Sequence, residues 1–170
     1  MLRVTRLGLI ACLVVLAACG SVGSAPASNT PASTAALPPP TLSAVEGSPA
    51  RMDAAAIRIA FDAGEAAQLI SPVPAGLDFG TDALLCVYLG ERPTGGWALD
   101  LQSAALVDGE LRILGRETRP RGTATQALTY PGDCASLPRA ALPAGELAVR
   151  ADDTISDEFI VDGQIEVPAS

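Results

Sequence analysis

The amino-acid sequence predicts an all-β domain, a small antiparallel β-sandwich or open barrel, that follows a signal peptide and a disordered tether. Between residues 52 and 168, apolar side chains alternate with polar or small ones in several short runs, with a period of two rather than 3.6. Turn signals rich in Gly, Pro and Asp separate these runs at intervals of ~8–14 residues. Short, regularly spaced strands of this kind are typical of small sandwiches and barrels.

The alternating runs are expected to form five strands, and one further segment a helical turn. In residues 84–89 both the even-numbered and the odd-numbered side chains are apolar, so we expect this strand to be buried on both faces. Trp97 stands in register with Leu99 and Leu101, so we expect a half-exposed strand over residues 97–102, with Trp97 in the core rather than on a contact surface. The other predicted strands cover residues 57–61, 111–113 and 147–149, and Ala and Glu favour a helical turn over 62–69.

Three segments are expected to reverse the chain. Residues 107–110 and 161–164 each contain an Asp-Gly pair, which favours a type I′ hairpin turn because both central residues need positive φ. Residues 90–96 contain Pro93 and two consecutive glycines, and we expect a wide hairpin loop there between strands 84–89 and 97–102.

The first 18 residues have the pattern of a lipoprotein signal peptide. Arg3 and Arg6 precede an apolar run over residues 7–18, which is shorter than the ~20 residues that a membrane-spanning helix needs. The run ends in Leu-Ala-Ala-Cys, which resembles the bacterial lipobox. We therefore expect cleavage before Cys19, acylation of Cys19 with palmitate or a similar chain, and attachment to the cell envelope. Gly20 rather than Asp follows, which favours the outer membrane if the bacterium has two membranes; the alternative is an ordinary signal peptide that contains a Cys.

Residues 19–51 are expected to be the lipidated Cys followed by a flexible Pro/Ala/Ser linker. Of the 31 residues from 20 to 50, 25 are Gly, Ser, Thr, Pro or Ala. This composition cannot bury enough apolar surface to offset the entropy lost on ordering. As a flexible coil the linker would span roughly 30 Å and hold a β-domain over residues 52–168 away from the membrane.

The charge and composition exclude several classes of function. The chain has 11 basic and 19 acidic residues, a net charge of −8, and loss of Arg3 and Arg6 would leave 9 against 19, or −10. An acidic domain repels phosphate backbones, so we expect no nucleic-acid binding. The sequence has no His and no Lys, which excludes Ser-His-Asp, Cys-His and Schiff-base catalysis. We expect no enzymatic activity, no catalytic residue, no metal site and no cofactor. The acidic pairs at 152–153 and 157–158 are interpreted as a solvated face.

Cys86 and Cys134 remain after the expected processing. An even pair of Cys in an exported protein favours a disulfide bond, and the alternative is two separate buried thiols. The bond would close a loop of about 49 residues and stabilise the fold by ~4 kcal/mol on the chain-entropy model.

A stretch in the middle of the chain resembles a known family. Residues 90–101 read Gly-Glu-Arg-Pro-Thr-Gly-Gly-Trp-Ala-Leu-Asp-Leu, which is similar to the signature of the PrcB C-terminal domain, where an aromatic residue follows Pro-Thr-Gly-Gly. The similarity continues through 107–111 and 119–122 and ends at 125–131. The resemblance implies a small bacterial β-domain, often on lipoproteins, whose founding member is a subunit of a surface protease complex and supports its assembly or stability. After Pro131 the chain departs from the family pattern, which predicts a reshaped edge near Cys134.

The loop at 90–96 is longer than a simple reversal needs and is bordered by aromatic residues, as in many contact surfaces. We expect the protein to be a membrane-anchored lipoprotein whose non-catalytic β-domain binds or stabilises an exported protease or another envelope protein. A chagasin-like protease inhibitor and a purely structural envelope lipoprotein remain as alternatives; the loop lacks the Asn before Pro and the second Thr of the inhibitors.

Within the loop, Thr94 is the favoured exposed contact. The candidate partner-binding residues are Arg92, Pro93, Thr94, Gly95, Gly96 and Trp97.

Overall fold

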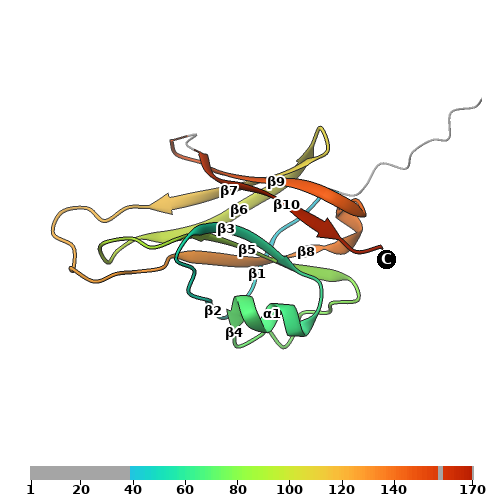
Figure 1. Cartoon of the computed structure of the whole chain (residues 1–170), viewed down its shortest axis with the longest axis horizontal. Helices are drawn as coiled ribbons and strands as arrows, with labels where there is room; N and C mark the ends of the chain where they lie inside the picture. The colour runs from blue at the N-terminus through green and yellow to red at the C-terminus, as the bar shows by residue number, and fades with distance from the viewer. Residues whose placement is uncertain (1–38, 157–158, 170) are drawn as a thin grey trace, which may run out of the picture. The chain divides into compact units, whose positions relative to one another are not determined.

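The computed structural model describes residues 39–156 and 159–169. The predicted signal peptide 1–18, the lipidation site Cys19, most of the predicted linker and the acidic pair at 157–158 lie outside the described residues. The described strands form two four-stranded sheets whose inner faces pack against each other, and a two-stranded ribbon beside them (Figure 1). The all-β prediction is confirmed: the two sheets form a sandwich and do not close into a barrel.

The first sheet is antiparallel throughout, and the second contains one parallel pair. The first has the strand order β1 (Ser43–Ala44), β8 (Gly132–Pro138), β5 (Asp82–Leu89) and β3 (Ala55–Ala60). The second has the order β10 (Phe159–Val167), β9 (Gly145–Asp153), β7 (Glu110–Thr118) and β6 (Ala98–Val107). Strands β7 and β9 pair in parallel, which the short-range pattern of the sequence did not predict.

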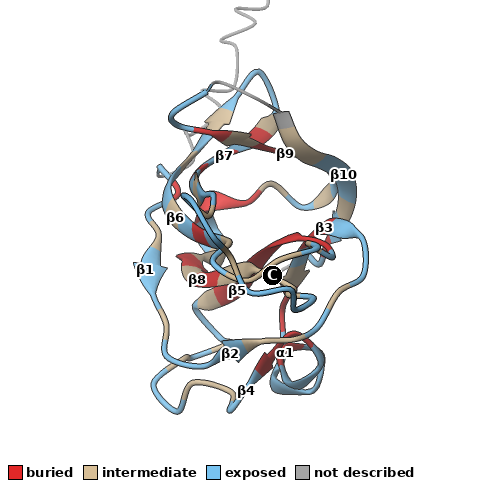
Figure 2. Ribbon diagram, turned by 90° about the vertical axis from the view of Figure 1, so that its left-hand side faces the viewer, coloured by how far each residue is buried: buried red, intermediate tan, exposed pale blue. Residues whose placement is uncertain are grey.

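Strand β5 is the centre of the core, and it is buried on both faces as predicted (Figure 2). Leu85 and Val87 point between the two sheets, where they pack with Leu111, Ile113 and other side chains of the second sheet. Leu84, Cys86 and Tyr88 point the other way, into a second apolar cluster with Cys134. Alternate residues of one strand therefore fill two different cores, which explains the continuous apolar run in the sequence.

A short helix covers the second cluster. Helix α1 (Ala63–Leu69) starts at the N-cap Asp62, whose carboxylate accepts a hydrogen bond from Glu65 N at 2.8 Å. The Glu65 carboxylate accepts in turn from Phe61 N at 2.8 Å, so the helix has a reciprocal N-terminal cap. The predicted helical turn over residues 62–69 is therefore present. The ribbon of β2 (Ser48–Pro49) and β4 (Ile70–Ser71) lies beside it, and a 3₁₀ turn, η1 (Arg139–Ala141), follows β8.

The folded domain begins before the predicted boundary at Met52. Ser43 and Ala44 pair with Ser136 and Ala135 at the edge of β8. Two apolar side chains in the predicted linker, Leu42 and Val45, pack against the main core and the second cluster respectively. Because small residues predominate around Leu42 and Val45, the composition did not indicate that these two side chains pack against the domain. The predicted linker 19–51 therefore includes residues that belong to the folded domain.

One of the two predicted Asp-Gly turns is present. Asp108 has φ 51° and Gly109 has φ 82°, and they join β6 to β7 with Val107 opposite Glu110. The other prediction is wrong, because Asp162 and Gly163 lie inside β10. The whole of β10 pairs with β9, and Val167 near its end is buried in the main core. The pairing of β10 with β9 and the burial of Val167 outweigh the local preference of Asp-Gly for a turn.

The predicted hairpin over residues 90–96 is also wrong. Strand β5 belongs to the first sheet and β6 to the second, so the segment between them crosses from one sheet to the other. Trp97 precedes β6 and is half-buried outside both core clusters, which contradicts its predicted place in the core. Gly96 at φ 87° turns the chain just before Trp97, and Leu99 is the first residue of β6 to enter the core. Residues 132–136, where the chain departs from the family pattern, form most of β8.

Candidate functional site

The predicted partner-binding loop is one half of a surface made by two loops. We call the segments 90–97 and 119–131 together the two-loop surface; they lie side by side at the left of Figure 1. Arg92 N donates to Thr129 O at 2.8 Å, and Thr129 N donates to Arg92 O at 3.0 Å. Gly95 N donates to Thr125 O at 3.0 Å, and Thr129 Oγ1 donates to Thr94 O at 2.8 Å. The second loop therefore holds the first along most of its length.

The consecutive glycines allow this close approach. A Cβ on Gly95 would overlap the hydroxyl of Thr125. Gly96 has φ 87°, a left-handed conformation that side chains disfavour, and a Cβ there would lie 3.1 Å from Pro120 Cβ. Gly95 and Gly96 thus serve the packing of the two loops, while Pro93 beside them is exposed.

Trp97 lies within reach of two arginines. The guanidinium carbons of Arg92 and Arg119 lie 5.2 Å and 5.9 Å from the centroid of its ring, within the range of cation–π attraction. The Trp97 indole N–H donates to Thr94 Oγ1 at 3.2 Å. This hydrogen bond occupies the Thr94 hydroxyl, and the residue is half-buried rather than the most exposed contact of the loop. Arg119 had no assigned role in the sequence, because only the packing of the two loops brings it to Trp97.

Two grooves flank the segment that enters the second loop. One has a volume of about 540 Å³, the other about 430 Å³, and both are lined by residues 118–121. The larger groove is completed by Gly95, Gly96, Thr123, Ala124 and Thr125. The smaller is completed by Arg116, Glu117, Asp153, Ile155 and Ser156. The grooves give the surface a concave form into which a partner's side chains can fit.

Asp153 closes the smaller groove and is not part of a solvated face. It is only 4% exposed, and its carboxylate accepts hydrogen bonds from Glu117 N at 2.9 Å, Ser156 N at 2.9 Å and Ser156 Oγ at 2.7 Å. These hydrogen bonds, that from Glu117 N above all, hold the pKa of Asp153 below its usual value. The interpretation of residues 152–153 as solvated is therefore wrong for Asp153, which fixes the turn after β9 to the end of β7.

The end of the second loop is held by a residue from the predicted linker. Tyr130 donates from its hydroxyl to Glu91 Oε2 at 2.8 Å, and this hydrogen bond raises the pKa of Tyr130. Arg51 hydrogen-bonds to the same hydroxyl, and its guanidinium carbon lies 3.8 Å from the centre of the tyrosine ring. No sequence pattern pointed to Arg51 at this place, because the contact joins residues that are 79 positions apart.

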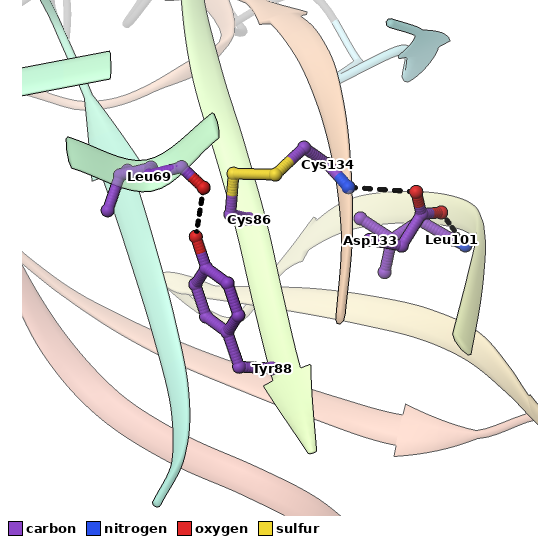
Figure 3. Close-up of a disulfide and its surroundings, with 6 residues drawn as sticks. All are labelled: Leu69, Cys86, Tyr88, Leu101, Asp133 and Cys134. Carbon is purple, nitrogen blue, oxygen red and sulfur yellow. Dashed lines mark hydrogen bonds between the residues drawn. A yellow bond between two sulfur atoms is a disulfide. The ribbon is translucent and has the colours of Figure 1, made fainter. Parts of the chain in front are cut away.

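Cys86 and Cys134 form a disulfide bond between β5 and β8 (Figure 3). They stand opposite each other on β5 and β8, with their Cα atoms 4.1 Å apart, inside the second apolar cluster. Tyr88 in the same cluster donates from its hydroxyl to Leu69 O at 2.7 Å, and burial raises the pKa of Tyr88 to about 12. The disulfide bond therefore joins β5 to β8 inside the apolar cluster that α1 covers.

The described residues contain no group of three or more His, Cys, Asp or Glu side chains that could hold a metal ion. Within the ranges 39–156 and 159–169, no helix has both the length and the apolar character needed to span a membrane.

Comparison with known proteins supports one family. The model of the PrcB C-terminal family matches residues 84–138, from the centre of β5 to the end of β8. The matched segment includes both loops of the two-loop surface. No curated protein and no solved structure matches the chain. The resemblance seen in residues 90–101 is therefore confirmed, and the segment 84–138 is similar to the PrcB C-terminal family.

Proposed function

We propose that this protein is an envelope lipoprotein whose β-domain binds and stabilises an exported partner, such as a protease, through the two-loop surface, with no catalysis of its own. The observation that carries this proposal is that the segment matching the PrcB C-terminal family begins before the first loop and ends after the second. The resemblance to a protease-complex subunit therefore rests on a segment that includes the whole two-loop surface.

The chemistry of the surface supports binding. Arg and Trp are among the residue types that contribute most to protein–protein binding, and here Trp97 contacts both Arg92 and Arg119. Two apolar side chains remain exposed nearby: Leu128 in the second loop is 57% exposed, and Ile155 in the smaller groove is 72% exposed. A partner could bury both.

The rigidity of the surface also supports binding. The backbone hydrogen bonds between residues 92 and 129 and between 95 and 125 hold the loops in one arrangement. A surface that is already ordered loses less entropy on association than a mobile loop. The anchoring half of the proposal rests on the lipobox at Leu16–Cys19, which would keep the domain at the membrane beside other envelope proteins.

Affinity purification from solubilised envelopes tests the proposal. The chain with a C-terminal affinity tag is compared with the Trp97→Ala and Arg119→Ala variants and with Arg112→Ala, which removes an exposed Arg of β7 paired with Glu110. We expect a partner to be recovered with the unchanged chain and with Arg112→Ala, and to be reduced with the other two. Recovery of no partner, or equal recovery with all four, would leave only the structural alternative.

A panel of cysteine and serine proteases separates partner binding from direct inhibition. The proposal predicts that the purified protein does not inhibit them at micromolar concentration. Inhibition that Trp97→Ala abolishes would instead support the chagasin-like alternative.

A further inference from the structure

We infer that the two-loop surface recognises an acidic, extended segment of its partner, and that Arg121 holds a carboxylate of this segment. The inference rests on the proposed function, because it names the chemistry of the partner at the same surface. It starts from the larger groove, whose lining contains two arginines and no acidic residue.

The larger groove has a basic lining although the chain as a whole is acidic. The whole chain has a net charge of −8, and nine arginines remain once Arg3 and Arg6 are set aside. Five of these nine lie on or beside the two-loop surface: Arg51, Arg92, Arg116, Arg119 and Arg121. A local concentration of positive charge on an acidic protein favours carboxylate-bearing partners and repels basic ones.

The described acidic side chains nearest the grooves are held by contacts of their own. Glu91 accepts a hydrogen bond from Tyr130, and Glu117 is paired with Arg119 at 3.1 Å. Asp153 accepts from Glu117 N and from Ser156. None of these three carboxylates lines the larger groove, so the described lining around Arg121 there contains no acidic side chain.

Arg121 is the guanidinium best placed to bind a carboxylate. It is exposed and lines both grooves. Neither Arg121 nor Arg116 makes a hydrogen bond or an ion pair within the part of the chain that the structure describes. The planar guanidinium can donate two parallel hydrogen bonds to one carboxylate, which makes it selective for this group. Arg119 next to it is oriented by Glu117 and by the Trp97 ring.

The rest of the lining suits an extended peptide. Thr118, Thr123 and Thr125 line the larger groove and are exposed, and their hydroxyls can hydrogen-bond to a peptide backbone. Ile155 offers an apolar contact in the smaller groove. Grooves of about 540 and 430 Å³ accommodate a few side chains each, so a strand-like segment with alternating acidic and apolar residues fits better than a folded element.

An anionic membrane surface is a poorer match for the same arginines. Phosphate headgroups form a flat layer, which makes no use of two separate grooves beside the same segment. The observations therefore favour a peptide segment, and lipid binding becomes an outcome that the experiment must separate.

Fluorescence anisotropy with the purified full chain tests the inference. The probe is a short labelled peptide in which Glu alternates with Leu, and its control has Gln in place of every Glu. We expect the Glu peptide to bind, to weaken as salt is raised, and to lose affinity about fivefold to tenfold in Arg121→Gln, as expected for removal of one charge-assisted contact. Arg112→Gln removes another exposed Arg of the same chain and is expected to leave the affinity unchanged.

Three results would overturn the inference: equal binding of the Glu and Gln peptides, no binding at about 1 mM peptide, or an affinity that Arg121→Gln does not lower. Arginine-dependent binding to phosphatidylglycerol vesicles without binding to the peptide would overturn it as well. If the affinity purification recovers a partner while the acidic peptide fails, this inference is wrong and the proposed function stands.

Discussion

The carboxylate of Asp133 joins the two sheets, because its Oδ2 accepts a hydrogen bond from Leu101 N at 2.8 Å (Figure 3). Asp133 lies on β8 of the first sheet, and Leu101 on β6 of the second. The register of β6 against β7 shifts between Leu101 and Ser103, so Gln102 forms a bulge beside the bonded amide. The other carboxylate oxygen accepts from Cys134 N at 2.9 Å, next to the disulfide.

We predict that Asp133→Ala lowers the free energy of unfolding by about 1–3 kcal/mol, because two half-buried backbone N–H groups lose their acceptor. Asp133→Asn keeps one acceptor oxygen and should lose less. Urea unfolding of both variants measures the effect, with the exposed Asp162→Ala as the control. A loss for Asp133→Ala no larger than that of the control would contradict the role given to this inter-sheet bond.

Asp153 should make the stability depend on pH in the acidic range. Its pKa is lowered in the folded state, so its contribution is present above the usual carboxyl pKa of ~3.9 and is lost as the pH falls through the lower folded value. The difference in Tm between the unchanged chain and Asp153→Asn should be constant near neutral pH and shrink below about pH 4. A difference that grows on acidification would contradict the hydrogen-bonding scheme.

The packing of the two loops should be sensitive to one methyl group. Gly95→Ala places a Cβ against the Thr125 hydroxyl, and overpacking of this kind costs about 1–3 kcal/mol. Thr125→Ala removes that hydroxyl, so the double variant should recover part of the loss. Gly76→Ala is the control, since nothing lies within 4 Å of a Cβ there. Hydrogen exchange at the amides of Gly95 and Thr129 follows the loops directly; unchanged protection in Gly95→Ala would count against a rigid surface.

We propose that anchoring depends on Cys19 and not on Cys12, which lies in the predicted signal peptide. We predict that cells fed radiolabelled palmitate label the unchanged chain and Cys12→Ala, and that Cys19→Ala is unlabelled and leaves the membrane fraction. A full-length, unlabelled, cytosolic product from the unchanged sequence would remove the lipoprotein half of the proposed function.

The local pattern of the sequence predicted what depends on local chemistry. The doubly apolar run 84–89 became the central strand β5, and the Asp108-Gly109 pair formed its turn. The Asp162-Gly163 turn failed because β9 supplies a partner along the whole of β10. Similarly, the parallel pairing of β7 with β9 joins segments that no short motif connects.

The candidate site, too, was predictable only where it depends on a local motif. The Arg92–Trp97 loop was visible as a motif, but its surroundings were not. Thr125 and Thr129 hold it, Arg119 contacts its tryptophan, and Arg51 supports the neighbouring Tyr130, all through contacts between distant parts of the chain. Trp97 was assigned to the core from its register with Leu99, which the turn at Gly96 interrupts.

Site-specific photo-crosslinking in intact cells tests the central claim most directly. A photoreactive residue at position 128, where Leu128 is 57% exposed in the second loop, is compared with one at position 107 in the β6–β7 hairpin, where Val107 is 36% exposed. The account predicts a covalent adduct with one exported protein from position 128 and none from position 107. Adducts from position 107 alone, or from neither position, would show that the two-loop surface is not where this domain meets a partner.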